Sequence, residues 1–475
     1  MLQTLKNAWK TKELRDKILF TLFILVIYRL GTVIPVPFVE AHSFADSFSG
    51  TILDQMNILS GGSLGTATLF ALGVSPYINA SIIIQLLAVV FPKLAELTKN
   101  DKEKMNLITR VTTVILAIVT ALGYYLLLKK NGALTNAATG TDNSSAWFYG
   151  IVIVACYVAG ASIIMWLGER INERGIGNGI SMILFANIIS SLPSFVYNLV
   201  SLAASTYQYE VKPWLYAIIS TIFAILLLAV MVVMFVFIIW VTGSERRIPI
   251  QYAKRVVGRK MYGGQSSNLP IKLNMTGVMP VIFASSIVSL VPTILALCGV
   301  TSETKNGWGT LAKILGSDGV VYPILLFVLI IAFAYFYTQI SFDPIEVSNN
   351  IKRQGGTIPG IRQGRPTAMY IKKILNKVTL VGALFLGIVA VLPVVAGPHI
   401  LQHIIYWILE GSIATIDKSN WLYTYYVSSI KSSAASLTSV FTFGGTSLLI
   451  IVGVVLETFR DLEAQLTMRN YKGFL

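Results

Sequence analysis

Charged residues and cysteines are scarce in this chain. Only 12% of its 475 residues are charged, and it has two cysteines and three histidines. A soluble domain carries about 25% charged residues, so the composition excludes an ordinary soluble protein. Cys156 and Cys298 both lie in apolar stretches without metal-ligand spacing, which excludes a disulfide framework. A content of 55% hydrophobic residues is instead typical of a polytopic membrane protein.

Carboxylates are missing from the centre of every apolar stretch. None of the 22 acidic residues lies there, and the deepest ones, Glu169, Glu245 and Glu457, lie at the ends. Ion-coupled transporters usually keep carboxylates at the membrane centre, and intramembrane aspartyl proteases require them, so both classes are disfavoured. His399 and His403 lack a third ligand at suitable spacing, and no nucleophile–base pair or phosphate loop appears. We expect no enzymatic activity, no metal and no cofactor.

Long apolar stretches are the main feature of the sequence. A membrane-spanning helix needs about 20 apolar residues, and ten such stretches are separated by polar loops. This pattern predicts an all-α protein with ten transmembrane helices. The stretches are Ile18–Val36, Ser75–Phe91, Leu107–Leu128, Trp147–Leu167, Ile176–Val196, Trp214–Val241, Leu273–Leu297, Val320–Ile340, Ile371–Val395 and Ser436–Leu456.

Lysine and arginine are distributed unevenly between the two sides that these stretches define. Of the 37 basic residues, 29 fall in the segments on one side, which include both chain ends. Seven fall on the other side, and Arg29 lies within the first stretch. Cytoplasmic loops carry the excess of Lys and Arg in membrane proteins. We therefore expect a multi-pass protein with both termini in the cytoplasm.

The stretch from Ser60 to Phe91 breaks the rules for a membrane helix. Three glycines loosen its start, and Gly73 and Pro76 interrupt it. Proline removes a backbone donor, so a helix should break there. In lipid, such a break survives only where protein or an aqueous cavity surrounds it. We predict a short re-entrant helix over residues 57–72 and a spanning helix over residues 75–92, and both a pore segment and a kinked helix inside a bundle fit this pattern.

Two loops on the basic side are much longer than a turn requires. They cover about residues 244–270 and 342–370, and each carries seven basic residues when the count runs on to Lys272 and to Lys377. Short β-favouring runs at Arg247–Ile250 and Thr357–Ile361, with Gly and Pro between them, fit either hairpins or helix–turn elements that project into the cytoplasm. Such loops suit a docking platform for a large partner, whereas attraction to anionic lipid is the simpler alternative for any single basic residue.

Six motifs stand out along the chain: FALGVSPYINASIIIQLL, GERINERGIGNGIS, RRIPIQYAKR, LPIKLNMTGVMPVIFASSI, TIPGIRQGRPT and FGGTSLLIIV. Together they resemble the bacterial SecY family, the channel subunits of the general protein translocase. The resemblance implies ten helices in two inverted-repeat halves, residues 1–200 and 201–475, around a central pore with a re-entrant plug helix. It also implies a channel that passes unfolded secretory proteins across the bacterial cytoplasmic membrane and releases hydrophobic segments into it.

The resemblance also assigns partners and residues. The implied partners are the small membrane subunits SecE and SecG, the SecA ATPase motor, the ribosome, signal peptides, unfolded preproteins and membrane lipids. The implied sites are a pore ring (Ile78, Ile82, Leu184, Ile188, Ile282 and Ile450), a plug at about residues 56–72 (Ser60, Gly61, Gly62, Leu64 and Phe70), a lateral gate (Gln85 and Asn274) and a surface for the motor or the ribosome (Arg246, Arg247, Lys254, Arg255, Arg259 and Arg362).

One region departs from the family pattern. About forty residues, 396–435, stand where the family usually has a short outer connection. Aromatic residues such as Tyr406 and Trp407 suit a segment that lies flat on the membrane surface.

The alternative function is a small-solute secondary transporter with a discontinuous substrate-binding helix, which the missing central carboxylates disfavour.

The charge distribution makes a testable prediction about orientation. A cysteine introduced by Val256→Cys or Gly356→Cys should react with an impermeant reagent only from the cytoplasmic face, and Asn420→Cys only from outside. The 29-to-7 division of basic residues is the reason. Labelling at Val256→Cys from outside would overturn the whole orientation.

Overall fold

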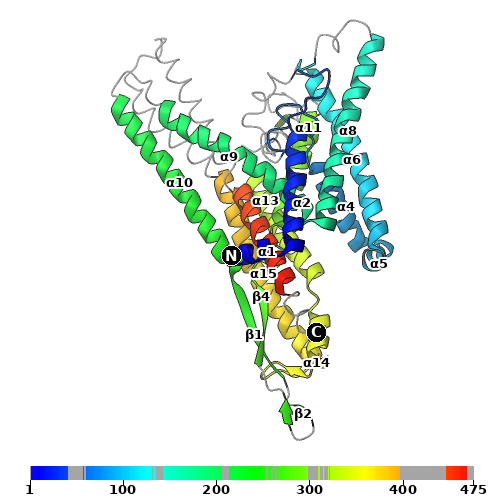
Figure 1. Ribbon diagram of the computed structural model, residues 1–475, viewed down its shortest axis with the longest axis vertical. Helices are drawn as coiled ribbons and strands as arrows, with labels where there is room; N and C mark the ends of the chain where they lie inside the picture. Colours follow the sequence, from blue (N-terminus) through cyan, green and yellow to red (C-terminus); the bar gives the residue numbers. More distant parts are fainter. Residues whose placement is uncertain are drawn as a thin grey trace.

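The molecule is a bundle of long helices with a small β-sheet at one end, as seen in the computed structural model (Figure 1). The strands project below the helices, and α10 diverges from α6 and α8 toward the opposite end. The structure describes residues 2–40, 57, 60–130, 132–134, 143–205, 213–252, 255–257, 260–262, 266–297, 309–310, 314, 319, 321–395 and 445–467. The predicted insertion 396–435 lies outside the described residues.

A helix lies on each of the ten apolar stretches. The main helices of the first half are α2 (Lys12–Gly31), α4 (Ser75–Val90), α6 (Lys102–Lys130), α8 (Asn143–Arg174) and α9 (Gly179–Ser205), with α1 (Leu2–Lys10) and α5 (Pro92–Asn100) as short additions. The second half has α10 (Pro213–Gly243), α11 (Met279–Leu297), α13 (Val321–Ser341), α14 (Pro344–Arg353), α15 (Arg365–Val395) and a helix over residues 445–467.

The long helices are apolar enough for a bilayer. Within the described residues, four helices meet both the length and the hydropathy of a membrane span, namely 103–130, 147–174, 321–353 and 365–395. Four shorter apolar helices lie in α4, α9, α10 and α11. The membrane-protein class is therefore confirmed, and a count of ten crossings stays a prediction.

The two long basic loops fold together as a small sheet, one of the two forms that their β-favouring runs allowed. β1 (Glu245–Tyr252) pairs antiparallel with β4 (Ser266–Lys272) and with β5 (Gly356–Thr357), while β2 (Arg255–Val257) and β3 (Lys260–Tyr262) form a second ribbon. The sheet is an addition to the all-α expectation. Its apolar face packs on α14 and α15 through a cluster of Ile248, Ile250, Ile271, Ile351, Ile358, Ile371 and Leu375.

The predicted re-entrant helix over residues 57–72 is wrong for the part that the structure describes. Residues 60–74 form successive turns rather than a helix. Gly61, Gly62 and Gly73 have φ angles of 69°, 87° and 56°, and Ala67 has φ 48°. Right-handed helix needs negative φ, so these residues interrupt it repeatedly. The predicted break at Pro76 is confirmed, because α4 begins at Ser75 with the proline in its first turn.

Helices surround the turns of residues 60–74. Phe70 stacks on Tyr28 of α2 with ring centroids 5.5 Å apart, and the absence of a side chain at Gly31 leaves room for its ring. On the other side, Tyr124 of α6 donates a hydrogen bond to the Leu64 carbonyl. Backbone groups in a membrane protein need such internal partners, since lipid offers none.

α8 approaches the same turns unusually closely. A Cβ atom at Gly160 would lie 2.0 Å from the carbonyl oxygen of Leu69, so only glycine allows this contact. The Tyr157 hydroxyl donates to the carbonyl of Ala67 at 3.4 Å. The turns are therefore packed inside protein along most of their length.

Both described chain ends meet on the side that carries the sheet. Ala8 and Leu14 pack with Ile176 of the α8–α9 turn and with Leu462 of the last helix. The Arg460 guanidinium donates to the Thr242 carbonyl at 3.2 Å, directly before β1. The two ends of the chain, the α8–α9 turn and the sheet thus share one side of the bundle, which we call the sheet side.

Candidate functional site

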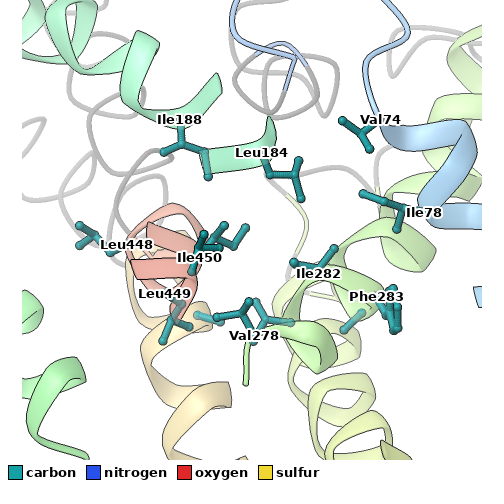
Figure 2. Close-up of a cluster of buried hydrophobic side chains, with 14 of the residues drawn as sticks. Val74, Ile78, Leu184, Ile188, Val278, Ile282, Phe283, Leu448, Leu449 and Ile450 are labelled. Carbon is teal, nitrogen blue, oxygen red and sulfur yellow. The ribbon is translucent and has the colours of Figure 1, made fainter. Parts of the chain in front are cut away.

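Aliphatic side chains from four helices face one another in the middle of the bundle (Figure 2). Ile78 comes from α4, Ile282 from α11 and Ile450 from the last helix, while α9 contributes Leu184 and Ile188. All five are buried and belong to one apolar cluster. Four separate helices therefore supply one apolar cluster, which we call the constriction. All six residues proposed for the pore ring, Ile82 included, are buried in it, and their role in a pore stays a prediction.

The contribution of α4 extends one turn beyond the expected residues. Val74 is buried at the N-cap of α4 and, in Figure 2, lies beside Ile78 on the same side of the constriction. The i,i+4 spacing between Val74 and Ile78 could have predicted that Val74 faces the same way as Ile78. Val74 is missing from the predicted ring because the predicted helix begins only at Ser75. The sixth expected residue, Ile82, is buried in the same cluster and lies outside the lining of the adjacent pocket.

A pocket of about 200 Å³ adjoins the constriction. Its lining joins constriction residues to polar side chains from α4, the α8–α9 turn, α9 and α13, with the side chains Tyr77, Ile78, Ser81, Gln85, Asn172, Asn178, Ile180, Ser181, Leu184, Met279, Ile282, Phe283 and Tyr337. The amide oxygens of Asn172 and Asn178 accept hydrogen bonds from backbone N–H groups of α9, from Gly179 at 2.7 Å and Ile180 at 3.1 Å. These two residues thus hold the start of α9 beside the pocket.

A hydrogen bond joins α4 to α13 across this pocket. The Tyr337 hydroxyl donates to Gln85 Oε1 at 2.7 Å, and Gln85 Nε2 donates to Ser81 Oγ at 2.8 Å. Phe283 of α11 lies beside the same tyrosine with ring centroids 5.0 Å apart. Hydrogen bonds between membrane helices contribute about 0.6 kcal/mol on average, so this contact holds the helices together weakly. Gln85 therefore links α4 to α13 beside the pocket, and its role in a lateral gate stays a prediction.

Asn274, the second residue predicted for the lateral gate, does not lie on a helix. It belongs to the bend that precedes α11, because the helix begins only at Met279 and Gly277 has φ 65°. The neighbouring Leu273 carbonyl packs against Gly382 of α15, where a Cβ atom would lie only 2.2 Å away. Asn274 thus lies before α11 and not within it, and its role in a lateral gate stays a prediction.

Exposed arginines cover the sheet side. Arg246 and Arg247 lie on β1, where Arg247 Nε and Glu245 Oε1 are 2.7 Å apart, and Arg362 lies in the turns before α15. Burial lowers the pKa of Lys272 at the end of β4, Arg460 lowers it further, and Glu245 opposes both. Lys254 and Arg259 lie outside the described residues, and Arg255 is described only as part of the backbone of β2.

The described part of the site consists of aliphatic side chains and neutral polar groups. Among the residues that the structure describes, no three His, Cys, Asp or Glu side chains are close enough to hold a metal ion. The constriction is aliphatic, and its neighbouring pocket carries hydroxyl and amide groups. An apolar constriction that gates by exclusion of water is a property of channels.

The fold and this site define a membrane channel. The chain belongs to the SecY family, whose family model matches residues 68–459. It is accordingly a subunit of a protein translocase, a protein-conducting channel and not an enzyme. The comparisons give no support to the alternative of a small-solute transporter.

Similar proteins cover the whole chain. The protein translocase subunit SecY of Streptomyces coelicolor is 41% identical over 489 residues, and that of Mycobacterium tuberculosis is 37% identical over 491 residues; each comparison spans 100% of both chains. Among solved structures, a protein conducting channel covers 95% of this chain and 92% of its own, with a TM-score of 0.56 and 17% identity. The canine Sec61 of a ribosome–channel complex matches with a TM-score of 0.53, 16% identity and the same coverage. These structures support the fold.

The geometry of the constriction makes a testable prediction. Replacing Ile78, Ile188 and Ile282 together by Ser should let ions pass through the resting protein, because hydroxyl groups widen and hydrate an apolar constriction. Single-channel current in planar bilayers measures this effect. The matched control replaces Val89, Ile189 and Val291, exposed aliphatic residues of the same three helices, and should stay silent. A silent triple variant with intact purified protein would contradict a sealing role for the constriction.

Proposed function

We propose that the chain passes unfolded secretory proteins through the constriction and releases hydrophobic segments sideways into the membrane. The observation that carries this proposal is the meeting of aliphatic residues from α4, α9, α11 and the last helix. Aliphatic side chains offer a passing chain no hydrogen bonds, so they favour no particular sequence. An ion crossing there would lose its water without gaining ligands, at a cost of about 2.5 kcal/mol or far more.

The turns of residues 60–74 act as a plug in this proposal. They pack between α2, α6 and α8 and lead directly into α4, which carries Ile78. One similar structure, with 18% identity and a TM-score of 0.59, is described as showing that the plug domain of SecY stabilises the closed channel and maintains a membrane seal. Ser60, Gly61, Gly62, Leu64 and Phe70 are all part of the described turns. Constriction and plug would together keep the resting protein closed.

Lateral release would occur between α4 and the pair α11 and α13. The pocket at this boundary has apolar walls from Ile180 and Phe283 and the weak Gln85–Tyr337 contact. A hydrophobic segment gains more by entering lipid than this single hydrogen bond costs to break. We place the gate at these three helices, with the halves 1–200 and 201–475 as the two bodies that separate.

The sheet side would face the cytoplasm and bind the motor. It carries both described chain ends and the exposed arginines of β1 and of the turns before α15. The excess of basic residues in these segments supports a cytoplasmic position. We propose that this surface engages SecA or the ribosome, and that SecE and SecG complete the complex in the membrane. Driving energy comes from the partner.

Charge reversal tests the docking surface. Arg362→Glu should lower SecA- and ATP-dependent transport of a signal-bearing precursor into proteoliposomes roughly tenfold at low salt and less at high salt, because salt screens charge pairs. Arg362 is exposed and lies before α15, so folding should be retained. Lys129→Glu makes the same charge change at the opposite end of the bundle and should leave transport unchanged. Normal transport by Arg362→Glu would assign this arginine to the lipid surface.

A further inference from the structure

We propose that Arg29 is a positioning residue that holds the plug closed at Gly61. The inference rests on the proposed plug and names the contact that retains it. Arg29 lies near the end of α2, close to Tyr28, which stacks on Phe70 of the plug. It also falls within the apolar stretch Ile18–Val36 of the sequence. Charged residues in such positions are costly and tend to have a function.

Three polar atoms surround the position that a Cβ atom would take at Gly61. A Cβ atom there would lie 2.9 Å from Arg29 Nη1, 3.0 Å from Asn187 Oδ1 and 3.0 Å from Ser190 Oγ. One atom comes from α2 and two come from α9. The backbone of Gly61, at φ 69°, fits between them only because it carries no side chain. We call Arg29, Asn187 and Ser190 the plug seat.

Two of the three residues of the plug seat, Asn187 and Ser190, lie on α9, the helix that also contributes to the constriction. Asn187 is fully buried and directly precedes Ile188. The Ser190 hydroxyl donates to the Asn187 carbonyl at 2.7 Å, which fixes its direction on α9. On α2, the Thr32 hydroxyl donates to the Arg29 carbonyl at 2.7 Å. The plug turn is thus held directly beside the residues that narrow the pore.

The attraction in the seat depends on the plug being in place. Arg29 Nη1 is buried and donates no hydrogen bond to any residue that the structure describes, so it acts on the oxygens of Asn187 and Ser190 as a charge on dipoles. Such attraction is strong only where water is excluded. A buried guanidinium nitrogen without a hydrogen-bond partner costs desolvation free energy. We infer that Arg29 offsets this cost through its attraction to the backbone of the plug turn at Gly61, which lies against the nitrogen and is lost when the plug leaves. The charge of Arg29 therefore favours the closed plug.

Cysteine labelling measures the position of the plug. Ser63 is 1% exposed, so Ser63→Cys, in a protein without Cys156 and Cys298, should react slowly with a water-soluble maleimide at rest. Arg29→Met, which keeps the length but removes the charge, should accelerate labelling about tenfold, a factor typical for the loss of one interaction of a charged group. Arg29→Lys should largely restore protection, because it keeps the charge.

A pair of glycines provides a matched control. Gly61 and Gly62 both have positive φ, so alanine strains the backbone at either position. Only Gly61→Ala meets the seat, since nothing lies within 4 Å of the Cβ position at Gly62. Gly61→Ala should therefore accelerate labelling of Ser63→Cys much more than Gly62→Ala does. Labelling at Ala390→Cys, fully buried on α15, should stay slow in every variant and so report intact folding.

The outcomes separate the seat from the plug itself. Rapid labelling of Ser63→Cys in otherwise unchanged protein would refute the proposed plug. Slow labelling there, with equally slow or slower labelling in Arg29→Met, would refute the role of Arg29 and leave the plug standing. Equal effects of Gly61→Ala and Gly62→Ala would also contradict the seat.

Discussion

A membrane interior tolerates irregular backbone only where protein satisfies its polar groups, and the structure depends on this constraint. The turns of residues 60–74 run beside apolar helices without forming a helix themselves. Tyr124 and Tyr157 donate hydrogen bonds to two of their carbonyls, and Gly31 and Gly160 let their atoms approach closely. The irregular segment therefore has a stable place only inside the ring of α2, α6 and α8, next to the constriction.

The proposed seal and the proposed gate have different physical origins: the seal depends on the exclusion of ions and water from the constriction, and the gate depends on weak contacts between helices. In the proposed function, the constriction would exclude ions because its aliphatic side chains offer no ligands, and for the same reason it would not bind a passing chain. The boundary of α4 with α13 is held by few polar contacts, among them Gln85 with Tyr337. A closed state built in this way is tight toward water and ions, and it opens at modest cost to a hydrophobic segment.

Sequence patterns predicted the parts governed by composition and spacing. Pro76 located the start of α4, β-favouring runs located β1 and β5, and the family resemblance pointed to six residues that are buried in one apolar cluster. The turns of residues 60–74 were missed because they depend on positive φ at several positions, which an apolar, helix-length pattern hides. Asn274 falls in the bend before α11, because Gly277 with φ 65° delays the start of the helix to Met279 and the apolar stretch begins before the helix does.

The central claim is that the turns of residues 60–74 are buried at rest and leave their place when a chain crosses. Hydrogen exchange of their backbone amides measures this directly, in the complete complex at rest and with a precursor stalled in the channel. We predict slow exchange at rest and much faster exchange with the stalled precursor, while α15 remains protected in both. Fast exchange at rest, or equally slow exchange in the two states, would contradict a displaceable plug.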